Sequence, residues 1–275
     1  TPRGKNHGYS LYNLAKRREE WYTEIMTPDK TGIFTEKQLD EVRETYIEMY
    51  GEDMGDLLYQ QEYWCSFHGS MLGAYFALQI AKAEREERIR SIPYDPALPV
   101  YTSWDIGRSD ATAIWFWQES GRERFYIDYY EDTGHDYEHY AKVLQNKQYN
   151  YAELVMPQDA ANKHMAAKKS VSDRFKEYGY KVRVLDGRTH QDIQGQINAS
   201  RALLPRCYFD EIKCERGLNA LRSYRKEYND KLRRFNENPL HDWASDGATA
   251  FNTGAMMPEK QKRKGASPQP KVPVY

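Results

Sequence analysis

Three strand-like segments in a row place the strongest restriction on the fold of this chain. They are rich in β-branched and aromatic residues, and turn-forming residues separate them: VYTSWD (100–105), TAIWFWQ (112–118) and RFYIDYY (124–130). Runs of this composition at hairpin distance predict adjacent antiparallel strands. Pro93, Pro96 and Pro99 come just before them and interrupt any regular element. We therefore expect a new structural region to begin after these prolines.

Helical and strand patterns alternate beyond the three strands. We expect helices at 135–147 and 163–178, and strands at 152–156 and 180–185. Antiparallel strands followed by this alternation predict an α/β fold, with a mixed sheet and helices packed on its faces.

The residues before the prolines have a mainly helical pattern. Thr35 and Gln38 form a capping-box pair, apolar residues recur at helical spacing from there to residue 50, and Gly51 stands where a helix would end. A second helical run covers about 71–90. At the other end of the chain, residues 258–275 combine basic residues and prolines with little apolar surface, which predicts a flexible basic tail.

Composition excludes several classes of protein. The chain has 40 Lys and Arg against 41 Asp and Glu, so bulk charge does not attract it to nucleic acid, although a local basic surface fits this balance. No stretch approaches the roughly 20 apolar residues that a membrane span needs. The three cysteines form no C-x-x-C pair, which argues against a disulfide framework or a zinc ribbon and favours free thiols in a reducing compartment.

Aspartates stand where an α/β sheet commonly builds its site. Asp105 ends the first strand, and Asp159 follows the strand at 152–156. Asp242 and Asp246 are four residues apart and would share one face of a helix that begins after the PL pair at 239–240. Clustered carboxylates without partner lysines suit hard divalent cations such as Mg²⁺, two of which can clamp a phosphodiester.

The spacing of these acids also fits a purely structural interpretation. Asp242 could be the N-cap of the helix, Asp110 a turn residue, and the remaining aspartates solvated acids at strand ends. The residues by themselves leave these alternatives open.

Four segments of the chain, in order, resemble a known family. They are SWDIGRSDATAIWFWQ, MPQDAANK, INASRALLPRCYFDEIKCERGLNALRSYRKEYND and PLHDWASDGATAF, and they span about 97–253. Together they resemble the nuclease domain of the terminase large subunits of tailed bacteriophages, the motors of viral DNA packaging. The resemblance implies a ribonuclease H-like fold and a metal-dependent endonuclease, a hydrolase that cuts double-stranded viral DNA concatemers during genome packaging into a procapsid.

The resemblance also implies a set of metal ligands. Asp105 and Asp159 match the first two acidic positions, and the third lies within HDWASD, as Asp242 or Asp246. Relatives often have S-H-x-A-D-A-F here, whereas this chain has Asp246 in place of the histidine and Thr249 in place of the aspartate. The third ligand is therefore left open, and we expect all four aspartates to serve a catalytic site that holds two Mg²⁺ or Mn²⁺ ions.

The N-terminal part is similar to the end of the motor's ATPase domain. TPRGKNHGY resembles the segment after the ATP-hydrolysing motif, and QQEYWCSF with GSMLGAYF resembles the last elements before the nuclease, although TPRGKN could also be a polar arm. The expected domains are the end of the P-loop ATPase domain with a linker (1–92), the nuclease (93–257) and the tail (258–275). Because no G-x-x-x-x-G-K-[ST] loop is present, we expect no ATP hydrolysis from this chain alone. ATP would act only through the missing part of that domain, as part of a longer polypeptide.

Two further patterns each allow a functional and a purely structural interpretation. Residues 201–234 contain ten Lys and Arg against five acids, which predicts contacts with DNA phosphates or, alternatively, a solvated helix with alternating charges. The residues that we expect to bind DNA are Arg225, Lys226, Arg233 and Arg234. His135 and His139 lie four apart, but HDYEH is not H-E-x-x-H and no third ligand is evident, so a solvated helix face is favoured over zinc.

The partners implied by the resemblance are double-stranded DNA, the terminase small subunit and the portal of the procapsid, in the cytoplasm of a bacterial host and without a membrane. A second function fits the same residues. The chain could be a DNA-gripping and portal-docking module of the motor, whose cutting depends on partners.

Overall fold

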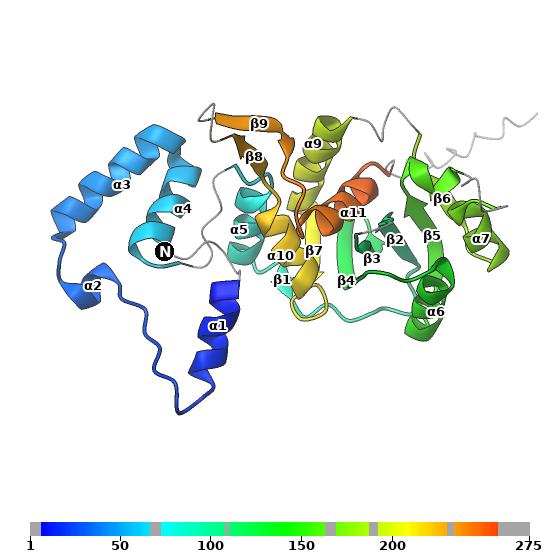
Figure 1. The fold of residues 1–275 in the computed structure, drawn as a ribbon, viewed down its shortest axis with the longest axis horizontal. Coiled ribbons are helices and arrows are strands. Elements are labelled where there is room, and N and C mark those ends of the chain that lie inside the picture. Colours follow the sequence, from blue (N-terminus) through cyan, green and yellow to red (C-terminus); the bar gives the residue numbers. More distant parts are fainter. Residues whose placement is uncertain are drawn as a thin grey trace, which may run out of the picture.

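The computed structural model describes residues 7–66, 73–107, 110–162, 169–186, 192–229 and 234–257. Figure 1 shows a row of helices on one side and a larger α/β body on the other. Among the described residues, no helix combines the length and the apolar character that crossing a membrane requires. The predicted tail lies outside the described residues.

The row of helices contains α1 (His7–Lys16), α2 (Pro28–Thr31), α3 (Glu36–Tyr50) and α4 (Glu52–Tyr63). The predicted capping box begins α3: the Gln38 N–H donates to Thr35 Oγ1 at 3.3 Å, and Gln38 Oε1 accepts from the Thr35 N–H at 2.9 Å. The helix ends at Gly51, whose φ of 84° suits glycine. This helix is therefore confirmed, including the residues that begin and end it.

One mixed sheet organises the α/β body. Its order is β1-β7-β4-β3-β2-β5-β6, with antiparallel pairing of β3 to β2 and β4 and parallel pairing elsewhere. The strands are β1 (Ile89–Arg90), β2 (Val100–Asp105), β3 (Thr112–Ser120), β4 (Glu123–Asp132), β5 (Tyr151–Met156), β6 (Val182–Val184) and β7 (Cys207–Asp210). The three predicted antiparallel strands are confirmed as neighbours at the centre of this sheet.

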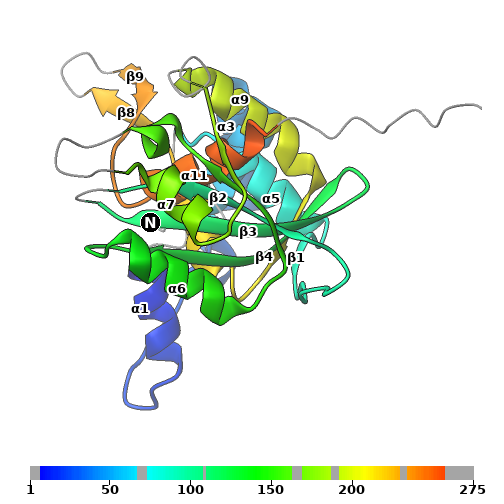
Figure 2. The ribbon, with the colours of Figure 1, turned by 90° about the vertical axis from the view of Figure 1, so that its right-hand side faces the viewer.

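Helices cover both faces of the sheet, as expected (Figure 2). On one face, α6 (Tyr137–Lys147) and α7 (Val171–Glu177) pack on a core that contains Trp104 and Phe116. On the other face, a core with Trp115 and Trp117 is covered by α5 (Ala77–Arg85), α9 (Ile193–Leu203), α10 (Glu215–Ser223) and α11 (Ser245–Ala255). Full burial of such large side chains stabilises the fold by about 1.5–3 kcal/mol each.

Several boundaries differ from the sequence prediction. The run at 71–90 is not one helix: its described part forms α5 and then β1, which pairs with β7, so the sheet begins before residue 93. Phe76 and Ile80 are buried in the core, which ties this segment to the α/β body. The predicted helix at 163–178 is described only from residue 169, and α7 begins at Val171.

The basic segment 201–234 is likewise not a single helix. It runs from the end of α9 through a 3₁₀ turn (Leu204–Arg206), β7 and α10 into a hairpin of β8 (Lys226–Asn229) and β9 (Arg234–Pro239). Its apolar residues, which include Phe209 and Leu218, are buried in the core, so tertiary packing divides the charge-rich run.

The last helix, α11, lies close against its neighbours because it has glycines where side chains of the sheet and of α10 approach. A Cβ on Gly247 would lie 2.6 Å from the Tyr129 hydroxyl and 2.9 Å from Ala220 Cβ. The Trp115 Nε1–H donates to the Gly247 carbonyl at 2.8 Å. These contacts fix the first turn of α11 beside the end of β4.

Candidate functional site

Acidic residues gather at one end of the strands, which we call the carboxyl edge of the sheet. Strands β2, β4 and β5 run in the same direction, so their carboxyl ends all lie at this edge. Asp105 is the last residue of β2, and Asp159 lies in a 3₁₀ turn (Gln158–Ala161) directly after β5. Because β2 and β5 are neighbours, the structure brings these two predicted site residues to the same edge.

Asp246 lies at the same edge but belongs to a helix and not to a strand. It lies in the first turn of α11 and is 8% exposed. Burial, and then the charges of Asp246, Asp110 and Asp159 together, raise the pKa of Asp105 well above its ordinary value. Burial, followed by the charge of Asp110, raises the pKa of Asp246 to about 6, although a hydrogen bond from the backbone N–H of Ala111 opposes the rise. Asp105, Asp110 and Asp246 therefore crowd one another electrostatically, and the exposed Asp159 adds a smaller effect on Asp105.

Two acids of this cluster were not among the predicted ligands. Asp110, interpreted from sequence as a turn residue, contributes its charge to both Asp105 and Asp246, and its Oδ2 lies 3.3 Å from His241 Nε2. Glu131 lies on the same face as Asp105, because Ala113 is the register partner of both. Its position at the end of β4 is visible in sequence, but its neighbours depend on the strand register.

Glu131 is held in place by two contacts. Its Oε1 accepts from Arg216 at 2.8 Å, and its Oε2 accepts from the Tyr129 hydroxyl at 2.5 Å. The Arg216 guanidinium also lies over the Trp243 ring, 4.5 Å from its centroid. The positive charge of Arg216 therefore compensates the negative charge of Glu131, beside the aspartates.

Asp242 has different surroundings from Asp246. The helix begins at Ser245 with Ala244 as its N-cap, so Asp242 precedes the helix and does not share a helix face with Asp246, contrary to the prediction from spacing. Asp242 Oδ2 lies 2.9 Å from Arg225 Nη1, and Oδ1 accepts from the Ala244 N–H at 3.0 Å. Its charge is therefore compensated locally, because the β8 hairpin carries Arg225 to this turn.

The predicted DNA-binding residues lie around this hairpin. Arg225 is paired with Asp242, and Lys226 begins β8. Arg233 lies outside the described residues, as does the side chain of Arg234. The structure thus places the side chains of Arg225 and Lys226, and it pairs Arg225 with Asp242.

The carboxylates of the acidic cluster are chemically suited to bind divalent cations. Carboxylate oxygens are the ligands that Mg²⁺ and Mn²⁺ prefer, and crowded carboxylates gain from a bound cation. In the described part of the chain, no three of these carboxylates offer oxygens that all lie within 4.8 Å of one another. Among the described residues, the acidic cluster is therefore wider than a set of ligands around a single ion.

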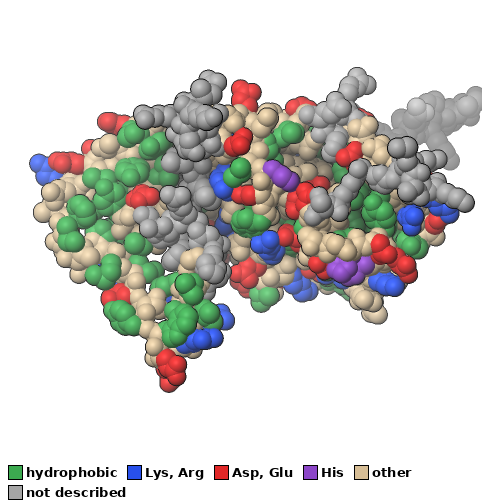
Figure 3. Space-filling model, viewed as in Figure 1, with side chains coloured by type: hydrophobic (Ala, Val, Ile, Leu, Met, Phe, Trp, Pro, Cys, Tyr) green, Lys and Arg blue, Asp and Glu red, His purple; other side chains and the backbone are tan. Residues whose placement is uncertain are grey.

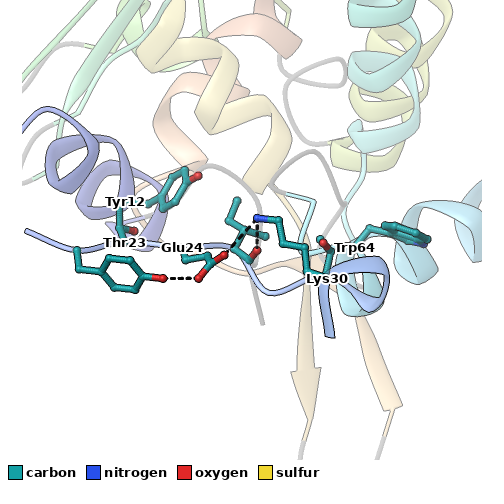
Figure 4. Close-up of a pocket in the computed structure, with 8 residues that line it drawn as sticks. Tyr12, Thr23, Glu24, Lys30 and Trp64 are labelled. Atoms are coloured by element: carbon teal, nitrogen blue, oxygen red, sulfur yellow. Dashed lines mark hydrogen bonds and ion pairs between the residues drawn. The ribbon is translucent and has the colours of Figure 1, made fainter. Parts of the chain in front are cut away.

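A shallow cavity of about 590 Å³ lies elsewhere, in the N-terminal helical part (Figure 4). Aromatic side chains form much of its wall, and Lys30 extends across it toward Glu24 at 3.6 Å and the Ile25 carbonyl at 3.1 Å. Its lining residues are Tyr12, Tyr22, Thr23, Glu24, Ile25, Thr27, Lys30 and Trp64. Because its acid is paired with a lysine, it lacks the crowded carboxylates of the sheet edge.

Comparison with known proteins gives structural matches only. No protein-family model matches this sequence, and no curated protein matches it. The structure of the large terminase from a thermophilic bacteriophage superposes with a TM-score of 0.52 at 15% identity, covering 92% of this chain and 60% of that one. The chain shares the fold of part of a phage large terminase. Its α/β body is the ribonuclease H-like mixed sheet flanked by helices that the resemblance implied.

Other terminase structures are also similar. The large terminase of the same phage in complex with ATP-gamma-S gives a TM-score of 0.52 at 16% identity, with 92% of this chain and 60% of that chain covered. The large terminase nuclease from the thermophilic phage G20c with bound magnesium gives 0.45 at 13% identity, covering 66% of this chain and 97% of that one. This chain thus spans about 60% of the length of the first of these terminases.

Proposed function

We propose that this chain is part of a terminase large subunit and that its α/β body is a divalent-metal-dependent DNA endonuclease. One observation carries the proposal. Asp105, Asp110, Asp159 and Asp246 come from different segments and converge at the carboxyl edge of the sheet, where burial and mutual repulsion raise the pKa of Asp105. A folded chain that keeps carboxylates crowded together gives up stability, and binding of metal ions is the chemistry that recovers it.

The roles of the residues follow from their surroundings. Asp105 is central because three other acids act on it, so Asp105, Asp159 and Asp246 would hold the ions, with Asp110 as an added ligand. Mg²⁺ or Mn²⁺ held there would stabilise charge on the phosphodiester oxygens and make an attacking water more acidic. Glu131, held by Arg216 and Tyr129, would border the site and orient water or the neighbouring ligands. Asp242 is the weaker ligand candidate, because Arg225 already compensates its charge.

The remaining assignments rest on the terminase fold. We assign the helices before the α/β body to the end of an ATPase domain, within residues 1–92, and residues 258–275 to a basic tail. The substrate would be double-stranded concatemeric DNA, and the partners would be a small subunit and a procapsid portal in the host cytoplasm. Any ATP site would lie in a part of the subunit that this chain does not contain, since the P-loop motif is absent from its sequence.

Cleavage of supercoiled plasmid tests the proposal. The purified chain with Mn²⁺ or Mg²⁺ should nick and linearise plasmid, and EDTA should stop the reaction. Asp105→Asn should lower the rate by at least about 100-fold, since it removes a ligand carboxylate without changing the side-chain size. The matched control is Asp40→Asn, which changes an exposed aspartate on α3 and should cleave at the parental rate.

Two results would count against the nuclease assignment. Parental cleavage by Asp105→Asn would show that the acidic edge is not the site. A parental chain that shifts plasmid in a gel but cuts it with neither metal would favour the DNA-gripping and docking module, whose cutting depends on partners.

A further inference from the structure

We propose that Asp132, His135 and His139 form a binding site for a transition-metal ion of the zinc class, separate from the acidic cluster. Among the described residues, these three form the group of potential metal ligands whose donor atoms all lie within 4.8 Å of one another. Sequence reasoning favoured a solvated helix face here because the two histidines had no visible third ligand. The fold supplies it: Asp132 is the last residue of β4, and His139 lies in the first turn of α6.

The distances suit a tetrahedral ion. Bonds of about 2.0–2.1 Å to zinc place neighbouring ligand atoms about 3.3 Å apart. Asp132 Oδ2 lies 3.2 Å from His135 Nε2 and 3.9 Å from His139 Nε2, and the two imidazole rings stack with centroids 3.8 Å apart. Both imidazoles thus place Nε2 near the same carboxylate oxygen, and binding of an ion requires the two rings to turn until their lone pairs converge on it.

Local structure holds each of the three residues. The Thr133 N–H donates to Asp132 Oδ1 at 2.9 Å, which leaves Oδ2 facing the histidines. Gly134, with a φ of 76°, turns the chain back toward the strand end. Asp136 caps α6 by accepting from the His139 N–H at 3.0 Å. These contacts hold the strand end, the turn and the start of α6 in place.

A tyrosine contacts two of the three residues. The Tyr130 hydroxyl donates to Asp132 Oδ2 at 3.0 Å and lies 2.8 Å from His139 Nε2. These contacts hold the carboxylate and the imidazole beside each other, and an ion bound to the same two atoms would displace the hydroxyl. The Tyr140 hydroxyl also donates to the Asp132 carbonyl at 3.1 Å, which joins the strand end to α6.

This cluster lies on the opposite face of the sheet from the nuclease candidate, at the same carboxyl end of the strands. Successive residues of a strand point to opposite faces, so Glu131 shares the face of Asp105, whereas Tyr130 and Asp132 lie on the face covered by α6. In Figure 3, histidine side chains with acidic ones beside them lie at the surface where β4 leads into α6. Imidazole ligands favour Zn²⁺ over Mg²⁺, so the two sites differ in the metal that they select.

The cluster is open to solvent, which decides what kind of site it would be. The side chains of Asp132, His135 and His139 are 42%, 41% and 34% exposed. Three protein ligands with solvent access leave one tetrahedral position for water or an outside ligand. An ion there would also fasten β4 to α6 and stabilise their junction.

Metal titration of the full chain tests the proposal. The background is the Asp105→Asn, Asp246→Asn double variant, which removes ligands of the acidic cluster. In this background, calorimetry with Zn²⁺ should show one site, and Co²⁺ should give the visible absorption of a low-coordinate imidazole complex. His135→Ala and His139→Ala should each weaken Zn²⁺ binding by at least about 100-fold, more than the loss of an outer partner causes.

The matched control is His241→Ala, which removes a different histidine that also contacts an aspartate. It should leave Zn²⁺ affinity unchanged. Melting temperatures in EDTA establish that each variant is folded, and Zn²⁺ should raise that of the parent more than that of His139→Ala. Equal Zn²⁺ affinity in the parent, His135→Ala and His139→Ala would overturn the site, as would a background variant that binds neither Zn²⁺ nor Co²⁺.

Discussion

Replacing Asp246 with asparagine tests whether the carboxylates at the sheet edge oppose folding until a cation binds. The pKa of Asp246 rises from an ordinary 3.8 to about 6 in the folded chain, chiefly through burial and then through the charge of Asp110. Between these two pH values, the folded chain keeps a proton that the unfolded chain has lost. The free energy of unfolding therefore falls as pH rises from about 4 to about 6, and the full penalty is present at pH 7.

The size of the effect follows from the same rise. At 1.36 kcal/mol per pH unit, a rise from 3.8 to about 6 corresponds to at most about 3 kcal/mol. Solvent and salt screen charges at an open edge, so we expect about 1–2 kcal/mol. The introduced carboxamide would keep an acceptor for the Ala111 N–H and lose the charge. Asp246→Asn should thus be more stable than the parent by this amount at pH 7 in EDTA, and equally stable near pH 4.

The assay is thermal or urea unfolding at pH 4 and pH 7, with EDTA or with Mn²⁺. Saturating Mn²⁺ should stabilise the parent, by about 2.7 kcal/mol when its concentration is 100 times the dissociation constant, and should stabilise Asp246→Asn much less. Asp242→Asn is the matched control four residues away. It breaks the 2.9 Å ion pair with Arg225 and should lower stability slightly, by up to about 1 kcal/mol.

Two outcomes would refute this reasoning. If Asp246→Asn is less stable than the parent at pH 7 in EDTA, the carboxylate makes contacts that stabilise the fold. If the difference between the two proteins is the same at pH 4 and pH 7, charge is not its cause.

Two further predictions concern the packing of α11 and the grip on DNA. Gly247→Ala places a methyl group 2.6 Å from the Tyr129 hydroxyl and should lower the free energy of unfolding in urea by about 1–3 kcal/mol. An unchanged unfolding midpoint would contradict the close packing of α11. Lys226→Gln should reduce the slope of log K against log salt for DNA binding by about 0.9, whereas Arg225→Gln should change it less because Asp242 already compensates Arg225. Equal slopes for both variants and the parent would place the hairpin away from DNA.

Local pattern predicted the elements that depend on neighbours in sequence. The capping pair Thr35 and Gln38 predicted the start of α3, because a cap is satisfied within one turn. Aromatic and β-branched runs predicted β2 at its observed bounds and β3 and β4 two or three residues too short, since their turns are short. The run at 71–90 was misread because β1 is short and is a strand only through its pairing with β7.

The residues of the candidate site also divide into those that the sequence predicted and those that only the structure brought together. Strand ends and family resemblance pointed to Asp105 and Asp159 from sequence, and the structure places both at one edge of the sheet. Asp110 and Glu131 could not be joined to them, because their proximity depends on strand register and on a loop. Helical spacing wrongly placed Asp242 and Asp246 on one helix face, since Ser245 begins α11.

The sequence by itself thus determined the three central strands, the start of α3, and which acids stand at the ends of β2 and β5. The tertiary structure alone decided which charges meet. It joined Asp242 to Arg225 through the β8 hairpin, and it placed Asp246 beside Asp105 and Asp110. The physical reason is the separation in sequence of the groups that interact. A helix cap or a hairpin is stabilised by residues close in sequence, whereas this cluster of carboxylates depends on how distant segments pack.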